Sequence, residues 1–106
     1  MIDIAVLRAM ARPEQMAVTE HGRQRLLERG LTIADVMSCI ASGEIIHQYE
    51  DDKPFPSCLL LGPGADGQPI HSVLSHDEAF IYLITAYSPD RDIWAADLRT
   101  KRRREP

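Results

Sequence analysis

The sequence predicts an α+β domain in which N-terminal helices pack on a four-stranded antiparallel sheet, followed by a short C-terminal helix. Apolar residues recur at helical spacing before Gly43, and strand-like apolar runs follow it. The connections between those runs are short, whereas parallel neighbours need crossovers of about a dozen residues or more. The chain has 106 residues, 44% of them hydrophobic and 26% charged, which is typical of one soluble domain.

Two helices are predicted in the first thirty residues. Residues 2–11 place apolar side chains near helical spacing and end before Pro13, although part of this segment would equally suit a strand. Thr19 is a good N-cap for a helix over His21–Arg29, and Gly30 follows that helix as a stop signal.

The third helix, Thr32–Ser42, has the clearest sequence signals. Thr32 is a favourable N-cap, Asp35 stands three residues further on, and Gly43 closes the segment. Its apolar stripe consists of Ile33, Val36, Met37 and Ile40. We expect this stripe to pack on the sheet.

Strand patterns follow the third helix. The expected strands are 44–50, 57–62, 69–76 and 80–87. The segment 62–69 holds three Gly and two Pro around Asp66-Gly67, which predicts a hairpin or loop. Asp90–Arg99 is predicted as a short terminal helix with Trp94 and Leu98 on one side.

Charge is distributed unevenly along the chain. The net charge is −4, and removing the last six residues leaves eight basic and fifteen acidic side chains, a net of −7. An acidic body disfavours a uniformly basic nucleic-acid binder but allows a local basic groove. Residues 44–52 hold four acids, whereas His21–Gly30 holds three Arg and one Glu.

The remaining composition predicts a cytoplasmic protein without a membrane span. The longest apolar run is far shorter than the roughly 20 residues that a bilayer requires, and the N-terminus lacks a secretory pattern. Cys39 and Cys58 lie in apolar surroundings and are interpreted as packed thiols, with a disulfide bridge as the alternative. The spacing of His and Cys indicates no metal site, and no cofactor motif is present.

One helical stripe has residues suited to chemistry on a phosphate. His21, Arg25 and Arg29 stand at i, i+4 and i+8. Guanidinium groups bind two phosphate oxygens at once, and imidazole moves protons near neutral pH. From spacing alone, a solvated helix face with ordinary ion pairs is the more common interpretation.

Two further candidates lie on predicted strands. Alternation places His71 on one face of its strand with Val73 and Ser75, and Tyr87 ends the last strand. Together, His71 and Tyr87 could flank a substrate as acid and base. The alternative is a pair of ordinary core or edge side chains with satisfied hydrogen bonds.

Many separate blocks of the sequence occur in the order of one known pattern. They are Thr19-Glu20-His21, Arg25, Glu28-Arg29-Gly30, Gly43-Glu44-Ile45-Ile46, Tyr49, Asp51-Asp52-Lys53-Pro54, Pro56-Ser57-Cys58-Leu59-Leu60-Leu61-Gly62, Pro69-Ile70-His71, Ile84-Thr85-Ala86-Tyr87, Pro89-Asp90 and Trp94. Over residues 17–99 the chain resembles domain-of-unknown-function family 4258. Residues 1–16 are then an N-terminal extension outside the resemblance, and 100–106 are a basic tail.

The resemblance implies a bacterial toxin-like protein. Members of the family are often encoded beside a zinc-finger antitoxin-like protein of the MqsA/YgiT type, and their fold is similar to the RelE/ParE/BrnT toxin group. Ribonucleases of that group cut RNA without a metal, using His, Arg, Lys or Tyr side chains. The expected function is therefore a metal-independent endoribonuclease, with His21, Arg25, Arg29, His71 and Tyr87 as its site. The alternative is a non-enzymatic module that binds a cognate protein through the acidic 44–52 edge.

Overall fold

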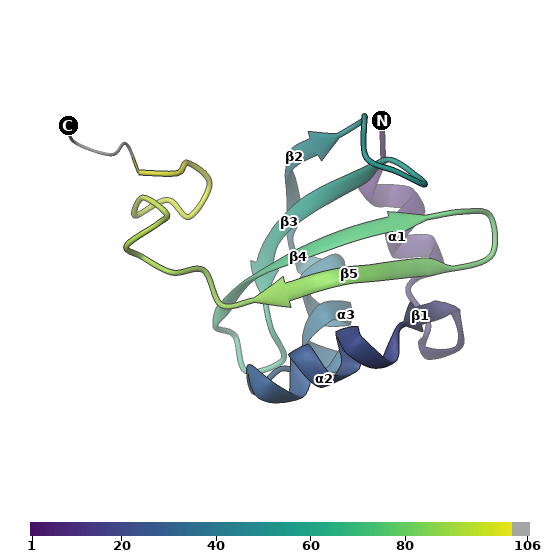
Figure 1. The fold of residues 1–106 in the computed structure, drawn as a ribbon, viewed down its shortest axis with the longest axis horizontal. Helices are drawn as coiled ribbons and strands as arrows, with labels where there is room; N and C mark the ends of the chain where they lie inside the picture. Colours follow the sequence, from purple (N-terminus) through teal and green to yellow (C-terminus); the bar gives the residue numbers. More distant parts are fainter. Residues whose placement is uncertain (103–106) are drawn as a thin grey trace.

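The sheet and the helices of this chain form two layers in the computed structural model, which describes residues 1–102 (Figure 1). Residues 103–106, the end of the predicted basic tail, lie outside the described residues. The elements are α1 (Ile4–Met10), a 3-10 turn (Pro13–Gln15), β1 (Met16–Val18), α2 (Glu20–Glu28), α3 (Ile33–Ser42), β2 (Glu44–Tyr49), β3 (Ser57–Pro63), β4 (Pro69–His76) and β5 (Ile81–Tyr87). The α+β class is thus confirmed.

The sheet has five strands in the order β1-β5-β4-β3-β2. The four strands β2 to β5 form the predicted antiparallel meander. The prediction of a four-stranded, purely antiparallel sheet is wrong, because β1 pairs in parallel with β5 through Met16–Val18. A strand of three residues is too short to show alternation. Its partner is the last strand of the chain, so the crossover rule applied to consecutive strands did not reveal the pairing.

Capping residues begin the helices as the sequence predicts. Thr19 Oγ1 accepts a hydrogen bond of 2.9 Å from the Gly22 amide at the start of α2. Thr32 and Asp35 form a complete capping box at the start of α3. Gly30 follows α2 with a φ of 68°, a conformation that glycine adopts without strain.

One face of the sheet packs against the helices and forms the main core. Figure 1 shows α1 and α3 behind the sheet and α2 along β5. The fully buried apolar side chains of this layer are Leu7, Val36, Cys39, Ile40, Cys58, Leu60, Leu74 and Ile81. Both cysteines are free, and burial raises the pKa of Cys39 to about 11 and that of Cys58 to about 12. They are therefore packed thiols.

Replacing Ile40 with alanine should lower the free energy of unfolding by about 2–4 kcal/mol, because the side chain is fully buried between α3 and the sheet. The measurement is urea denaturation followed by circular dichroism. Leu27→Ala is the matched control, since Leu27 is 79% exposed and its loss should cost less than about 0.5 kcal/mol. Equal effects of the two substitutions would contradict this packing.

The predicted helix over Asp90–Arg99 is wrong. The segment forms successive turns, in which aspartate side chains accept hydrogen bonds from nearby backbone amides. Asp90 Oδ1 accepts from the Asp92 amide at 2.8 Å, and Asp97 Oδ1 accepts from the Thr100 amide at 3.2 Å. Such bonds compete with the backbone hydrogen bonds of a helix. The prediction from apolar spacing did not take them into account.

The C-terminal turns bring a second apolar cluster onto the other face of the sheet. Trp94 and Leu98 pack with Leu59 there, and Leu98 has a φ of 60°. Trp94 pairs with Lys101 in an isolated β-bridge, and the Arg102 amide donates to the Ile93 carbonyl at 2.7 Å. The first residues of the basic tail are therefore packed against the C-terminal turns.

Candidate functional site

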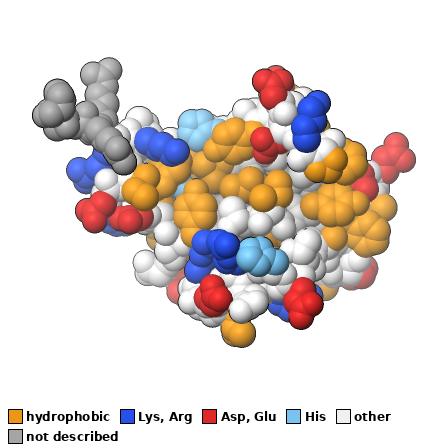
Figure 2. Space-filling model, viewed as in Figure 1, with side chains coloured by type: hydrophobic (Ala, Val, Ile, Leu, Met, Phe, Trp, Pro, Cys, Tyr) orange, Lys and Arg blue, Asp and Glu red, His pale blue; other side chains and the backbone are white. Residues whose placement is uncertain are grey.

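A shallow groove of about 350 Å³ runs along α2. Its lining residues are His21, Gln24, Arg25, Glu28 and Arg29. Gly22 and Leu26 are the buried residues of this helix, and the groove residues are exposed beside them. Figure 2 shows histidine beside lysine or arginine over α2 below β5. The predicted stripe thus lies in one exposed groove.

Arg29 anchors the groove to the edge of the sheet. Its Nη1 donates to Thr85 Oγ1 and to the Ala86 carbonyl, both at 2.9 Å. β1 covers the edge of β5 only as far as Leu83, so Arg29 satisfies part of the edge that no strand covers. These two bonds fix a guanidinium beside Tyr87, the next residue along β5.

His71 and Tyr87 form a hydrogen-bonded pair on the face of the sheet that carries the C-terminal turns. His71 is fully buried, with Nε2 2.7 Å from the Leu98 carbonyl and Nδ1 3.3 Å from the Tyr87 hydroxyl. A carbonyl only accepts, so Nε2 carries the proton and Nδ1 accepts from the phenol. The Trp94 ring packs edge-on against the imidazole at 4.5 Å between centroids.

Burial determines the protonation of this pair. Removal from water lowers the pKa of His71, and the bond to the Leu98 carbonyl opposes that shift only in part. Burial also raises the pKa of Tyr87, with Tyr49 adding to the increase and the Arg29 charge opposing it. At neutral pH the pair is therefore a neutral imidazole bonded to a protonated phenol.

The five predicted residues fall into two connected groups. His21, Arg25 and Arg29 share the α2 groove, and Arg29 is held on the two residues that precede Tyr87. His71 has no exposed surface and is bonded to Tyr87, which follows Thr85 and Ala86 on β5 but does not line the groove. The structure therefore brings Arg29, Tyr87 and His71 into one chain of neighbours, whereas within residues 1–102 His21 is not hydrogen-bonded to His71.

The sequence does not predict the contacts of Trp94 and Leu98 with His71. Their spacing indicates an apolar surface but not which residue that surface covers. In the structure the Leu98 carbonyl sets the imidazole tautomer, and the Trp94 ring packs against the His71 imidazole and shields it from water. A backbone acceptor of this kind leaves no residue-type signal in a sequence.

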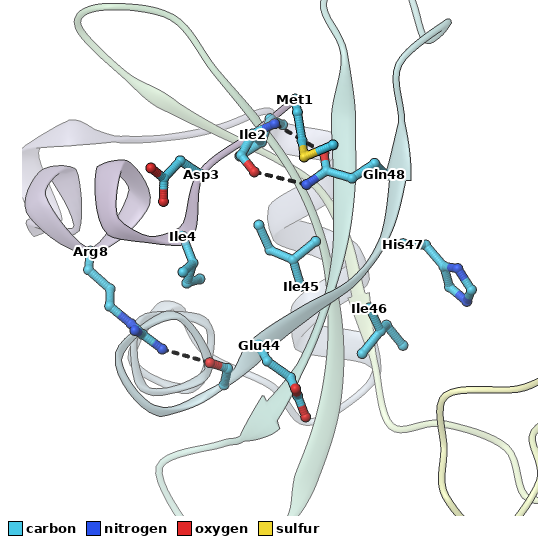
Figure 3. Close-up of a pocket in the computed structure, with 11 residues that line it drawn as sticks. Met1, Ile2, Asp3, Ile4, Arg8, Glu44, Ile45, Ile46, His47 and Gln48 are labelled. Carbon is cyan, nitrogen blue, oxygen red and sulfur yellow. Dashed lines mark hydrogen bonds between the residues drawn. The ribbon is translucent and has the colours of Figure 1, made fainter.

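Another hollow, of about 750 Å³, lies between the N-terminus and β2 (Figure 3). Its polar groups hold the fold together. Arg8 donates to the Gly43 carbonyl at 2.7 Å and to the Ile40 carbonyl at 3.0 Å, and Gln48 makes two bonds with the Ile2 backbone. Figure 3 shows His47 pointing away from it. The polar side chains around this hollow therefore hold the N-terminal segment in place, and we do not assign them a catalytic role.

Lowering the pH from 7 to 5 should reduce the free energy of unfolding through His71. The unfolded chain binds this proton near pH 6.5, whereas the folded chain binds it only at lower pH because burial lowers the pKa. Stability from this group is therefore complete above about 6.5 and is lost as the pH falls, by at most about 1.4 kcal/mol per pH unit.

The measurement is urea denaturation at several pH values between 5 and 7. His71→Gln should flatten the slope in this window, and Gln24→Ala, an exposed substitution without a titrating group, should leave it unchanged. Asp35, Asp77 and Asp97 have pKa values lowered from 3.8 by hydrogen bonds, so they act below this window. An unchanged slope in His71→Gln would contradict the assignment.

Within residues 1–102, no three His, Cys, Asp or Glu side chains gather in a way that could hold a metal ion. No helix in this described part of the chain is long and apolar enough to cross a membrane.

The fold and the groove define a small α+β domain with a cationic helix at the open edge of a mixed sheet. The family model for "Domain of unknown function (DUF4258)" matches residues 18–88, and the chain belongs to this family. The match includes all five candidate residues. No curated protein and no solved structure matches the chain. The likeness to the RelE/ParE/BrnT group thus stays a prediction.

Proposed function

We propose that this protein is the toxin-like component of a bacterial toxin–antitoxin system and acts in the cytoplasm as a metal-independent endoribonuclease with a RelE-like fold. The observation that carries the proposal is the α2 groove, which His21, Arg25 and Arg29 line together. Arg29 is also bonded to Thr85 and Ala86, the two residues that precede Tyr87. Imidazole, guanidinium and phenol are the groups that phosphodiester cleavage needs when no metal takes part. The groove gives the acidic body one local basic surface.

In the proposed reaction His21 accepts the proton of a ribose 2′-hydroxyl, whose oxygen attacks the adjacent phosphorus. The O2′–P bond forms and the P–O5′ bond breaks, which leaves a 2′,3′-cyclic phosphate and a 5′-hydroxyl. Arg25 and Arg29 bind the phosphate oxygens and stabilise the charge that develops on them. His21 takes the role of base because it is exposed, whereas His71 is fully buried.

Tyr87 supplies the second proton transfer. Its raised pKa keeps the phenol protonated at neutral pH. In the proposed step the phenolic O–H leaves its bond to His71 Nδ1, and its proton passes to the departing 5′-oxygen. The Arg29 charge stabilises the phenolate that results. His71 is a positioning residue in this scheme, because its Nδ1 accepts from the phenol and orients it.

A second candidate function rests on the other edge of the sheet. β2 is the outermost strand, and it leads into the exposed acidic residues Glu50, Asp51 and Asp52. An edge strand can pair with an extended segment of a partner. The alternative function is thus a non-enzymatic module that binds a cognate antitoxin, expected to be of the zinc-finger MqsA/YgiT type.

Expression of the full chain alone in a bacterium distinguishes the two functions. We expect growth arrest and fragmentation of cellular RNA, both relieved when the neighbouring antitoxin gene is expressed with it. Arg25→Ala should relieve the arrest at equal protein level. Tight binding of the neighbouring gene product, without arrest and without RNA cleavage, would favour the binding module instead.

A further inference from the structure

A second hollow, of about 750 Å³, opens at the end of the sheet where β5 begins. The 52–55 loop, β1 and the first half of β5 surround it. Its lining residues include Thr19, Asp52, Phe55, Ser75, Tyr82 and Ile84. None of them takes part in the reaction proposed above.

Two aromatic rings, Phe55 and Tyr82, line this hollow, and a third, Phe80, lies beside Tyr82. Phe55 and Tyr82 lie nearly parallel, with 9° between their planes and 6.1 Å between their centroids, and Phe80 lies 6.4 Å from Tyr82. Phe55 is 43% exposed and Phe80 42% exposed. Figure 2 shows hydrophobic side chains over this end of the sheet. A flat apolar surface left in water is suited to stacking against a planar ligand.

A buried hydroxyl in the same hollow lacks a partner. Ser75 is 4% exposed, and its Oγ makes no hydrogen bond within residues 1–102. An unsatisfied buried hydroxyl costs stability, typically about 1–3 kcal/mol, unless a ligand satisfies it. Substitutions that remove such a group are usually neutral or stabilising in the free protein. Ser72 Oγ is also buried without a partner, but only Ser75 lines this hollow, so Ser75 is the hydroxyl that a ligand bound there would satisfy.

Asp52 supplies an acceptor at the rim of the hollow. Its Oδ2 accepts from the Ser57 hydroxyl, whereas Oδ1 has no hydrogen-bond partner within the described residues 1–102. A carboxylate only accepts, so a ligand beside it must present N–H or O–H groups. The hollow thus combines stacking surface, a free hydroxyl and a free carboxylate oxygen.

The hollow and the α2 groove are lined by residues that stand close together on α2 and β5. Thr19 lines the hollow and caps α2, two residues before His21. Ile84 lines it from β5, next to Thr85, which holds Arg29. We infer from this proximity that a ligand with its planar group in the hollow can direct a phosphate toward the groove.

We propose that this hollow binds the base of a nucleotide next to the scissile phosphate of RNA, with guanine preferred. The proposal rests on the proposed function for its substrate. Stacking on Phe55 and Tyr82 holds the base, as in other single-strand sites. Guanine is preferred because its N1–H and N2–H₂ point the same way and both donate. Asp52 accepts both when Oδ1 takes one donor and Oδ2, which accepts from Ser57, uses its second lone pair for the other.

Binding of guanosine to the full chain tests the pocket without any cleavage step. Guanosine has no phosphate, so it reports the hollow alone. Titration followed by NMR should shift the Ser75 and Tyr82 amides, and inosine and cytidine should bind more weakly. Phe55→Ala should weaken guanosine binding about fivefold or more. Tyr82→Phe, which keeps the ring, should leave it unchanged.

Ser75→Ala separates a ligand role from a structural one. The variant should bind guanosine more weakly while its unfolding midpoint stays equal or rises. Arg25→Ala should leave guanosine binding unchanged but weaken the binding of inorganic phosphate. Absence of guanosine binding, or binding that Phe55→Ala and Ser75→Ala do not change, would overturn the proposal.

RNA cleavage gives a second, separate readout. Oligonucleotides with one guanosine among cytidines should be cut next to the guanosine, and Phe55→Ala should abolish this preference. Cutting without base preference would overturn the pocket and leave the ribonuclease function standing. Guanosine binding by a protein that cuts no RNA would overturn the ribonuclease function and leave base binding in this hollow standing.

Discussion

Replacing Arg25 with alanine should lower kcat/KM for RNA cleavage about 100-fold or more while the protein stays folded. The guanidinium faces the α2 groove and donates no hydrogen bond within residues 1–102, so its loss removes phosphate contacts and little packing. Cleavage of a short labelled RNA measures the effect, and thermal unfolding checks the fold. Arg25→Lys should be more active than Arg25→Ala, since an ammonium keeps the positive charge but cannot make the bidentate hydrogen bonds of a guanidinium.

Arg23→Ala is the matched control for Arg25→Ala. Arg23 lies on the same helix and is also exposed, but it lines a different hollow on the other side of α2. Loss of a cation two residues away should change cleavage by less than about threefold, the scale expected for a screened surface charge. If both substitutions reduce cleavage equally, general electrostatic attraction explains the effect and the groove is not the site.

Replacing Gly62 with alanine should lower the free energy of unfolding by about 3 kcal/mol or more, or prevent folding. A Cβ at Gly62 would lie 2.7 Å from the Gly43 Cα and 2.8 Å from the Cys39 carbonyl oxygen. Both atoms belong to the backbone at the end of α3, so neither can turn aside. The close approach of β3 to this helix end therefore depends on a residue without a side chain.

Gly64→Ala provides the comparison for Gly62→Ala. The new Cβ would lie 3.0 Å from a carboxylate oxygen of Asp35, which belongs to a side chain. A side chain can adjust by a few tenths of an ångström, so the loss in stability should be clearly smaller, below about 1.5 kcal/mol. Urea midpoints of the two variants measure the difference. A Gly62→Ala protein as stable as the wild type would contradict the described contact between α3 and β3.

The elements that local signals specify were predictable from the sequence. Thr32 and Asp35 form the capping box that begins α3, and Asp66-Gly67 forms the turn between β3 and β4, where Gly67 has a φ of 86°. β1 was not predictable, because its pairing with β5 depends on residues more than sixty positions away. The C-terminal turns were missed because aspartate side chains bond the backbone there and replace helical bonds.

The same division applies to the candidate site. Helical spacing was enough to place His21, Arg25 and Arg29 in one groove, since the relation among them is local. Two features of the site depend on contacts across the chain. Arg29 is anchored on Thr85, and His71 is sealed under the Leu98 carbonyl. No spacing rule predicts either contact.

We expect the α2 groove to cleave RNA through a cyclic phosphate. The most direct measurement is incubation of the purified full chain with RNA in EDTA, followed by identification of the new 3′ ends. We expect 2′,3′-cyclic phosphate ends from the wild type and from Arg23→Ala, and about 100-fold fewer from His21→Ala and Arg25→Ala. Ends that are absent, that require a divalent metal, or that persist in His21→Ala and Arg25→Ala would contradict the account.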